Sequence, residues 1–148
     1  MKITVIIFML LMLPLVTMAN GPPDAQINQK DLDFPPCPDT PNCVSSLAMD
    51  PAKKVEPFPL RGDTSRSLEL LTGVIRSMPR TTIVSTSADR IEAEFRSLLG
   101  FVDDILFVVN SDEDVIHVRS ASRKGSWDLG VNRRRVERIR RKYLESGI

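Results

Sequence analysis

Residues 90–122, RIEAEFRSLLGFVDDILFVVNSDEDVIHVRSAS, decide the fold class. The first part of this stretch, 90–98, alternates apolar and charged side chains, which is typical of an antiparallel strand with one buried face. Apolar and β-branched runs follow at 103–110 and 115–122, and only short turns separate them. Short joins of this kind favour a meander, in which each strand pairs with the next.

The flanking sequence predicts one more strand and two helices. Residues 81–86 are β-branched, which favours a strand. A helix is predicted over 64–77, because Asp63 offers a start signal and Pro79 a stop. A second helix is predicted over 131–144. The predicted fold is therefore α+β: a small antiparallel four-stranded sheet (meander) with an N-terminal and a C-terminal helix packed on it.

The beginning of the chain has the pattern of a signal peptide. Lys2 gives a positive start, residues 3–15 are almost all apolar, and small residues lie at Thr17 and Ala19. This pattern predicts a signal peptide over 1–19 that is cleaved after Ala19, with an uncleaved membrane anchor as the alternative. We therefore expect an exported protein, periplasmic or secreted.

The rest of the chain is predicted to be a linker and one domain. Residues 20–36 are rich in proline and polar side chains, which indicates a flexible linker. Residues 37–148 are predicted to form a single α+β domain that starts with an extended segment. The only cysteines, Cys37 and Cys43, are six positions apart, and export predicts that they form a disulfide.

Charge is distributed unevenly along the domain. Residues 119–142 contain ten basic and two acidic side chains, whereas residues 20–118 contain nine basic and sixteen acidic ones. Arginines near a helix N-terminus suit a carboxylate, phosphate or sulfate. The candidate anion site is Arg119, Arg123, Asp128, Asn132, Arg134 and Arg135.

The same pattern also fits a purely structural motif without a ligand. Here Asp128 or Asn132 would cap the second helix, and the arginines would pair with acidic side chains. Asp128 is the nearest acid in the sequence, and Asp103 or Asp104 could reach the arginines from a neighbouring strand. A charged face in contact with solvent is the remaining alternative.

Catalysis has weaker support in the sequence. A small hydrolase or transferase could use Ser120, Ser122 or Asp128 beside the arginines, but no nucleophile elbow and no nearby histidine base accompany them. The only histidine, His117, is expected on an exposed face of the sheet, and the only tryptophan, Trp127, is expected to pack under its loop. We predict no metal and no cofactor.

Three classes of partner fit the sequence. An anionic small molecule fits the arginine cluster, and a membrane surface or an envelope protein fits a basic helix on an exported protein. Nucleic acid is disfavoured by export and by a predicted mature chain with no net charge. The identity of the partner is not specified by these features.

Three stretches resemble the domain of unknown function family 1499, a family of uncharacterised bacterial and plastid proteins. They are Pro41-Asn42-Cys43-Val44-Ser45-Ser46, Phe101-Val102-Asp103-Asp104, and the long motif from Arg119 through Gly125 to Glu137. The resemblance covers the chain from about Cys37 to Tyr143. It implies that these positions form one site or one structural core, and it implies no activity. The function we predict is an exported, non-enzymatic binding or envelope-associated module.

Overall fold

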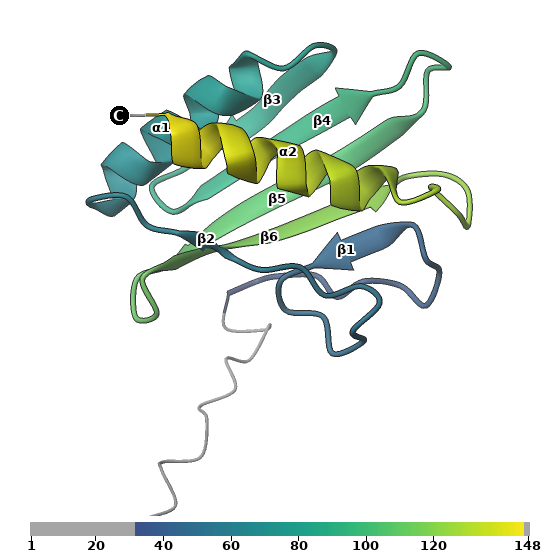
Figure 1. Ribbon diagram of the computed structural model, residues 1–148, viewed down its shortest axis with the longest axis horizontal. Coiled ribbons are helices and arrows are strands. Elements are labelled where there is room, and N and C mark those ends of the chain that lie inside the picture. Colours follow the sequence, from purple (N-terminus) through teal and green to yellow (C-terminus); the bar gives the residue numbers. More distant parts are fainter. Residues whose placement is uncertain (1–31, 147–148) are drawn as a thin grey trace, which may run out of the picture.

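The centre of the fold is an antiparallel sheet (Figure 1). The computed structural model describes residues 32–146. Four strands form the predicted meander: β3 (Thr81–Thr86), β4 (Arg90–Arg96), β5 (Val102–Asn110) and β6 (Val115–Ser122). Each pairs antiparallel with the next, so the predicted α+β class is confirmed.

The predicted count of four strands is wrong, because the described residues form a sheet of six. Two short strands, β1 (Cys43–Ser45) and β2 (Phe58–Pro59), both pair antiparallel with β6. Strands of three and two residues are too short to show a period of two, so the sequence pattern missed them. Pro59 is tolerated because β2 is an edge strand, where a missing N–H need not break the ladder.

Two helices, α1 (Thr64–Arg76) and α2 (Val131–Glu145), lie over one face of the sheet (Figure 1). The first begins after Asp63, whose side chain accepts a hydrogen bond from the backbone N–H of Arg66 at 2.7 Å. The apolar sides of both helices and the inward side chains of the sheet share one buried core. This core includes Phe58, Leu68, Leu71, Ile75, Ile91, Ile105, Phe107, Val118, Val136, Ile139 and Tyr143.

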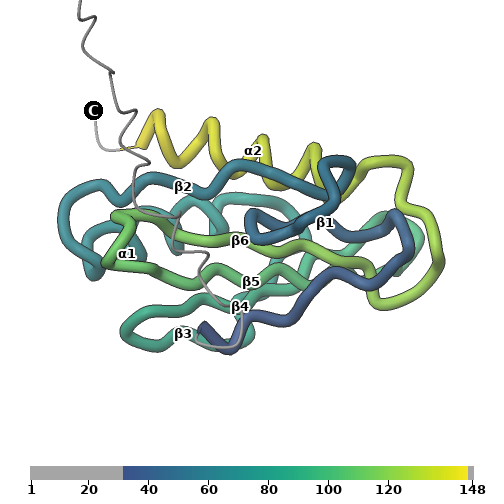
Figure 2. The backbone as a smooth tube through the Cα atoms, turned by 90° about the horizontal axis from the view of Figure 1, so that it is seen from below, coloured from purple at the N-terminus to yellow at the C-terminus, as the bar shows by residue number. Residues whose placement is uncertain are grey.

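The first described residues cross the opposite face of the sheet (Figure 2). Leu32 O accepts a hydrogen bond from Arg90 at 3.0 Å. Phe34 is 3% exposed and meets the ring of His117 edge-on, with 6.3 Å between ring centroids. His117 is therefore only 3% exposed, and the expectation of a surface histidine is wrong.

Some of the predictions for the N-terminal part concern residues that the structure describes, and others do not. The predicted signal peptide, 1–19, and most of the predicted linker, 20–36, lie outside the described residues. The cysteine pair is described: the Sγ atoms of Cys37 and Cys43 are 1.99 Å apart and their Cα atoms 5.7 Å apart, as a disulfide requires. Within residues 32–146, neither helix has the length and apolar character needed to cross a membrane.

Candidate functional site

Asn132, in the first turn of α2, is the centre of a buried polar network. Its side chain is fully buried, and its Oδ1 accepts a hydrogen bond from Ser120 Oγ at 2.6 Å and from Arg135 at 2.8 Å. Ser120 is also fully buried, on the face of β6 that meets α2. Because a buried polar group without a partner is costly, these bonds fix how α2 sits on the sheet.

The amide group of Asn132 extends the network to two further segments. Its Nδ2 donates to Asn42 O at 3.1 Å, to Ser122 Oγ at 3.0 Å and to Asp128 Oδ2 at 2.8 Å. Asn42 directly precedes β1, and Ser122 ends β6. One side chain therefore joins β1, β6 and the loop before α2.

Asp128 caps the first turn of α2 from two positions before the N-cap residue, Gly130, and forms an ion pair with no arginine among the described residues. Its carboxylate accepts the backbone N–H groups of Gly130 and Asn132, each at 2.8 Å. Partial burial by itself would raise the pKa of Asp128, but these hydrogen bonds hold it below its usual value. Of the two interpretations of Asp128, the cap is the one that matches these contacts.

Arg135 makes the buried ion pair of the site. Its guanidinium contacts the carboxylate of Asp103, and the two side chains are 10% and 7% exposed. Arg135 also lies over the ring of Phe95, 4.9 Å from its centroid. The pair lies on the helix side of the sheet, because Asp103 is opposite Phe95 in the register of β4 and β5.

Arg123 and Arg119 lie on the other face of the sheet. Arg123 contacts Asp104 at 2.7 Å and Glu94 at 2.5 Å, and these hydrogen bonds raise its pKa. Arg119 donates to Pro36 O at 3.4 Å, and burial lowers its pKa despite the opposing charge of Asp104. The adjacent residues Asp103 and Asp104 therefore pair with arginines on opposite faces of the sheet, as side-chain alternation in a strand requires.

The structure does not bring the four predicted arginines to one place. Arg119 and Arg123 are on the face away from the helices, and Arg135 is under α2. Arg134 is exposed and donates to Leu129 O at 2.8 Å. Of the four, Arg119 and Arg134 donate to carbonyl oxygens, whereas Arg123 and Arg135 pair with carboxylates. Anion binding stays a prediction.

The alternative catalytic residues are all engaged in the polar network. Ser120 is fully buried, Ser122 accepts from Asn132, and Asp128 caps the helix. His117 lies on the opposite face, where its Nδ1 is 3.1 Å from Ser46 Oγ. Within residues 32–146, no group of three or more histidine, cysteine or acidic side chains could hold a metal ion.

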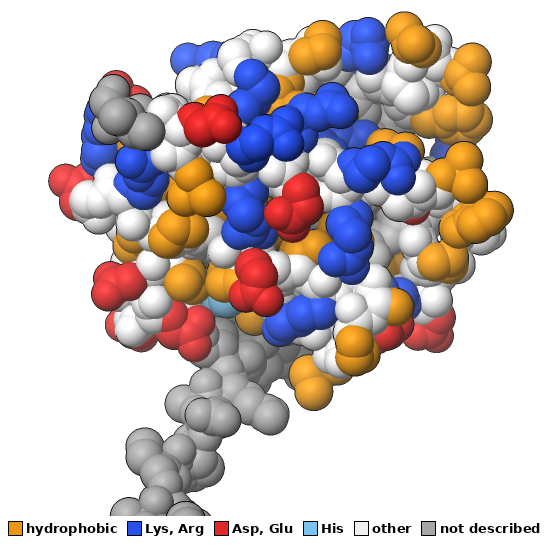
Figure 3. Space-filling model, in the orientation of Figure 1, with side chains coloured by type: hydrophobic (Ala, Val, Ile, Leu, Met, Phe, Trp, Pro, Cys, Tyr) orange, Lys and Arg blue, Asp and Glu red, His pale blue; other side chains and the backbone are white. Residues whose placement is uncertain are grey.

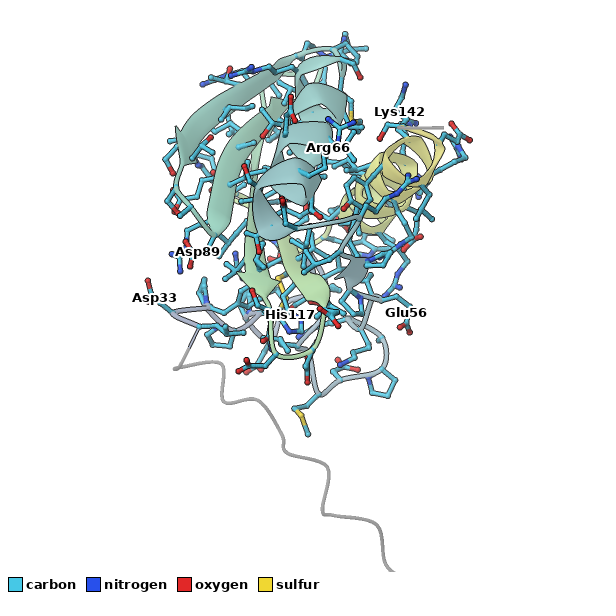
Figure 4. The ribbon with its side chains drawn as sticks, turned by 90° about the vertical axis from the view of Figure 1, so that its left-hand side faces the viewer. Asp33, Glu56, Arg66, Asp89, His117 and Lys142 are labelled. Atoms are coloured by element: carbon cyan, nitrogen blue, oxygen red, sulfur yellow. A yellow bond between two sulfur atoms is a disulfide. The ribbon has the colours of Figure 1, made fainter. Side chains whose placement is uncertain are left out.

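An open groove of about 490 Å³ lies between α1 and α2. Both basic and acidic side chains line the groove: Arg66 and Lys142 on the one hand, Glu69 and Glu145 on the other. Figure 4 shows Arg66 and Lys142 on either side of this groove. None of the anion-site or catalytic residues predicted from the sequence lines this groove.

The second prominent feature is an exposed apolar surface at one end of the sheet. It consists of Leu98 and Leu99, each 84% exposed, Phe101 at 53%, Trp127 at 72% and Leu129 at 66%. We call these five residues the apolar loop end. Figure 3 shows hydrophobic side chains gathered along the right-hand edge of the molecule, where the β4–β5 and β6–α2 loops of Figure 1 lie. The expectation that Trp127 packs under its loop is wrong.

The polar network holds the loop that carries Trp127 and Leu129. Asn42 Nδ2 donates to Gly125 O at 2.5 Å, and Asp128 fixes the other end of the loop. A backbone hydrogen bond of 3.0 Å from Arg123 N to Val102 O ties this loop to the one that carries Phe101. The buried motif therefore supports the exposed surface.

The fold and the site define a small α+β domain in which a polar motif locks an edge strand, a loop and a helix onto an antiparallel sheet. The family model described as "Protein of unknown function (DUF1499)" matches residues 33–143. The chain belongs to this family, and the resemblance inferred from its motifs is confirmed. A search of curated proteins finds no match.

The apolar loop end was not predicted from sequence as a surface. Its signal was present in Leu98-Leu99-Gly100-Phe101, an apolar run placed in a turn between two strands. Turns are normally polar, so a run of this kind in a turn indicates contact with something other than water. The asparagine that anchors the neighbouring loop, Asn42, was noted only as part of the family resemblance.

Proposed function

We propose that this chain is an exported, non-enzymatic binding module of the cell envelope, and that it binds through the apolar loop end. One observation carries the proposal. Five large apolar side chains, each more than half exposed, lie at one end of the sheet, and the loop that carries two of them is held by Asn42 and Asp128. Apolar surface gathered in this way on a soluble domain marks an interaction site.

Two features argue against the alternatives. The serines of the proposed hydrolase or transferase are used in the buried network, and His117, the only histidine in the sequence, lies on the opposite face of the sheet beside Ser46. A purely structural role accounts well for Asn132, Ser120 and Asp128, but it leaves the exposure of Trp127 without a reason. The motif is therefore structural in this proposal, and the surface that it supports is functional.

Cell fractionation tests the proposal. The full chain is produced in its native host, and the share that sediments with the envelope is compared with that of a Trp127→Ser and Leu129→Ser double variant. We expect the double variant to move largely to the soluble fraction. The matched control is Met49→Ser, since Met49 is 85% exposed in the segment after β1 and lies outside the apolar loop end. Equal sedimentation of all three proteins would contradict the proposal.

Export is tested separately by the mature N-terminus. The predicted cleavage after Ala19 leaves Asn20 as the first residue. Mass spectrometry of the protein from its host should find this end. An intact Met1 on protein that stays inside the cell would contradict the exported location while leaving the binding surface to be judged by fractionation.

A further inference from the structure

We infer that the partner of the apolar loop end is the surface of an anionic lipid bilayer, into which Trp127 and its apolar neighbours insert. This inference rests on the proposed function and names the partner of the same surface. Three observations carry it: the degree of exposure of these side chains, the positive charge beside them, and the hydrogen bonds that hold the loop of Trp127.

The exposure of the side chains suits shallow insertion. Leu98 and Leu99 are each 84% exposed and Trp127 is 72% exposed, so these side chains stand clear of their surroundings. Tryptophan, moreover, prefers the boundary between headgroups and acyl chains, where its apolar ring and polar N–H are both accommodated.

The charge beside the loops is complementary to anionic headgroups. Lys124 and Arg134 are both exposed, and neither forms an ion pair with a carboxylate within residues 32–146. The one acidic residue in the β6–α2 loop, Asp128, uses its oxygens to cap α2. Basic residues beside an apolar surface strengthen attachment to anionic lipid.

The support of the β6–α2 loop lowers the entropic cost of insertion. Asn42 holds Gly125, Asp128 holds Gly130, and Arg134 holds the carbonyl of Leu129 at 2.8 Å. Trp127 lies between these anchors. A loop that is already ordered loses little freedom on binding, so a larger part of the apolar contact is retained as affinity.

Trp127 itself is the probe for the test, because it is the only tryptophan of the chain. The full chain is mixed with vesicles of zwitterionic lipid alone and with vesicles that contain phosphatidylglycerol, each with and without brominated acyl chains. With anionic vesicles we expect a blue shift of Trp127 emission and quenching by the bromines, both weaker with zwitterionic vesicles. Since the readout is local to Trp127, attachment through the apolar residues 3–15 does not by itself produce it.

A charge variant separates the electrostatic contribution to lipid binding from the contribution of the apolar side chains. Lys124→Glu should raise the lipid concentration for half-maximal quenching by about fivefold or more, because each basic residue near an anionic surface contributes about fivefold. Arg134 is left unchanged in this variant because it also anchors the carbonyl of Leu129. Arg138→Glu is the matched control, since Arg138 is exposed on α2 two turns beyond the loop, and it should change this concentration little.

Two outcomes overturn the inference. Absence of quenching in both kinds of vesicle excludes the bilayer. A blue shift that needs no lipid and grows with protein concentration, together with a doubled mass, assigns the surface to a second copy of the chain instead. In either case the proposed function stands if the fractionation of the Trp127 and Leu129 variant still differs from that of wild type, and it fails if it does not.

Discussion

Asn132 Nδ2 donates a hydrogen bond to the backbone carbonyl oxygen of Asn42 at 3.1 Å, although the two residues are 90 positions apart. The bond joins the first turn of α2 to the residue that precedes β1. It is buried, so water cannot replace it when either partner changes.

Asn132→Ala should therefore lower the free energy of unfolding by about 3 kcal/mol, because it leaves the buried Ser120 hydroxyl with fewer partners and removes three donor contacts. Urea denaturation followed by circular dichroism measures the change. Arg138→Ala, an exposed change on the same helix, is the control and should have little effect. Equal stability of the two variants would mean that the network does not stabilise the fold.

The two adjacent aspartates of β5 make a matched comparison. Asp103→Ala removes the partner of a buried guanidinium and should cost about 3 kcal/mol in the free energy of unfolding. Asp104→Ala should cost much less, because Arg123 is exposed and keeps Glu94. A double-mutant cycle of Asp103→Ala with Arg135→Ala checks that the loss belongs to the pair. If both aspartates behaved alike, the assignment of their faces would be wrong.

This difference between neighbours shows what the sequence could predict and what it could not. Alternation along β4 fixed which side chains share a face, and the short turns predicted the meander correctly. Strand alternation also requires that Asp103 and Asp104 point to opposite sides. The sequence could not decide which of them is buried, because that depends on how far the 97–101 turn shifts one strand along the next.

The second limit of the sequence-based predictions was burial by residues that are distant in the sequence. His117 was assigned to an exposed face because nothing in its own strand indicates what covers it. The cover is Phe34, more than 80 positions earlier in a proline-rich segment with no periodic pattern. The arginines were grouped by their proximity in sequence, whereas the sheet separates Arg123 from Arg135. The capping position of Asp128, which depends on local spacing alone, was among the interpretations the sequence did supply.

The burial of His117 predicts a pH dependence of stability. Burial lowers the pKa of His117, while the nearby Glu113 carboxylate, 3.5 Å away, opposes this shift and Lys54 adds to it. The folded chain therefore favours neutral His117, and the unfolded chain binds more protons near pH 6. The free energy of unfolding should fall as the pH drops below about 6.5, by at most about 1.4 kcal/mol per pH unit from this group.

Denaturation curves between pH 7.5 and pH 5 measure this dependence. His117→Gln removes the titrating group and keeps a polar side chain near Ser46, so the difference in stability between variant and wild type should change across this range. A difference that is constant with pH would show that His117 does not titrate differently in the folded and unfolded chain.

Asp128 predicts a loss of stability at lower pH. Its pKa lies below the usual value in the folded protein, so its contribution is present above about pH 4 and is lost as the pH falls further. Asp128→Ala should cost about 1 kcal/mol at pH 7, through the lost cap and not through unpaired arginines. The cost should shrink toward pH 3, and a cost that is the same at both pH values would contradict the capping role.

The disulfide connects stability to the apolar loop end. Cys37 and Cys43 close a short loop that contains Asn42, and Asn42 holds both Asn132 and Gly125. Cys37→Ser should lower the free energy of unfolding by about 2 kcal/mol, because a short closed loop restricts the unfolded chain by about that much. Cys37 is the better position to change, since it is partly exposed whereas Cys43 is 1% exposed and its replacement would also disturb the core.

Hydrogen exchange of Cys37→Ser should speed up around Asn42 and in the loop of Trp127, and remain slow in the central strand β5, where the core is intact. If exchange increased in β5 as much as in these loops, the disulfide would stabilise the whole domain without a particular role in holding the apolar loop end.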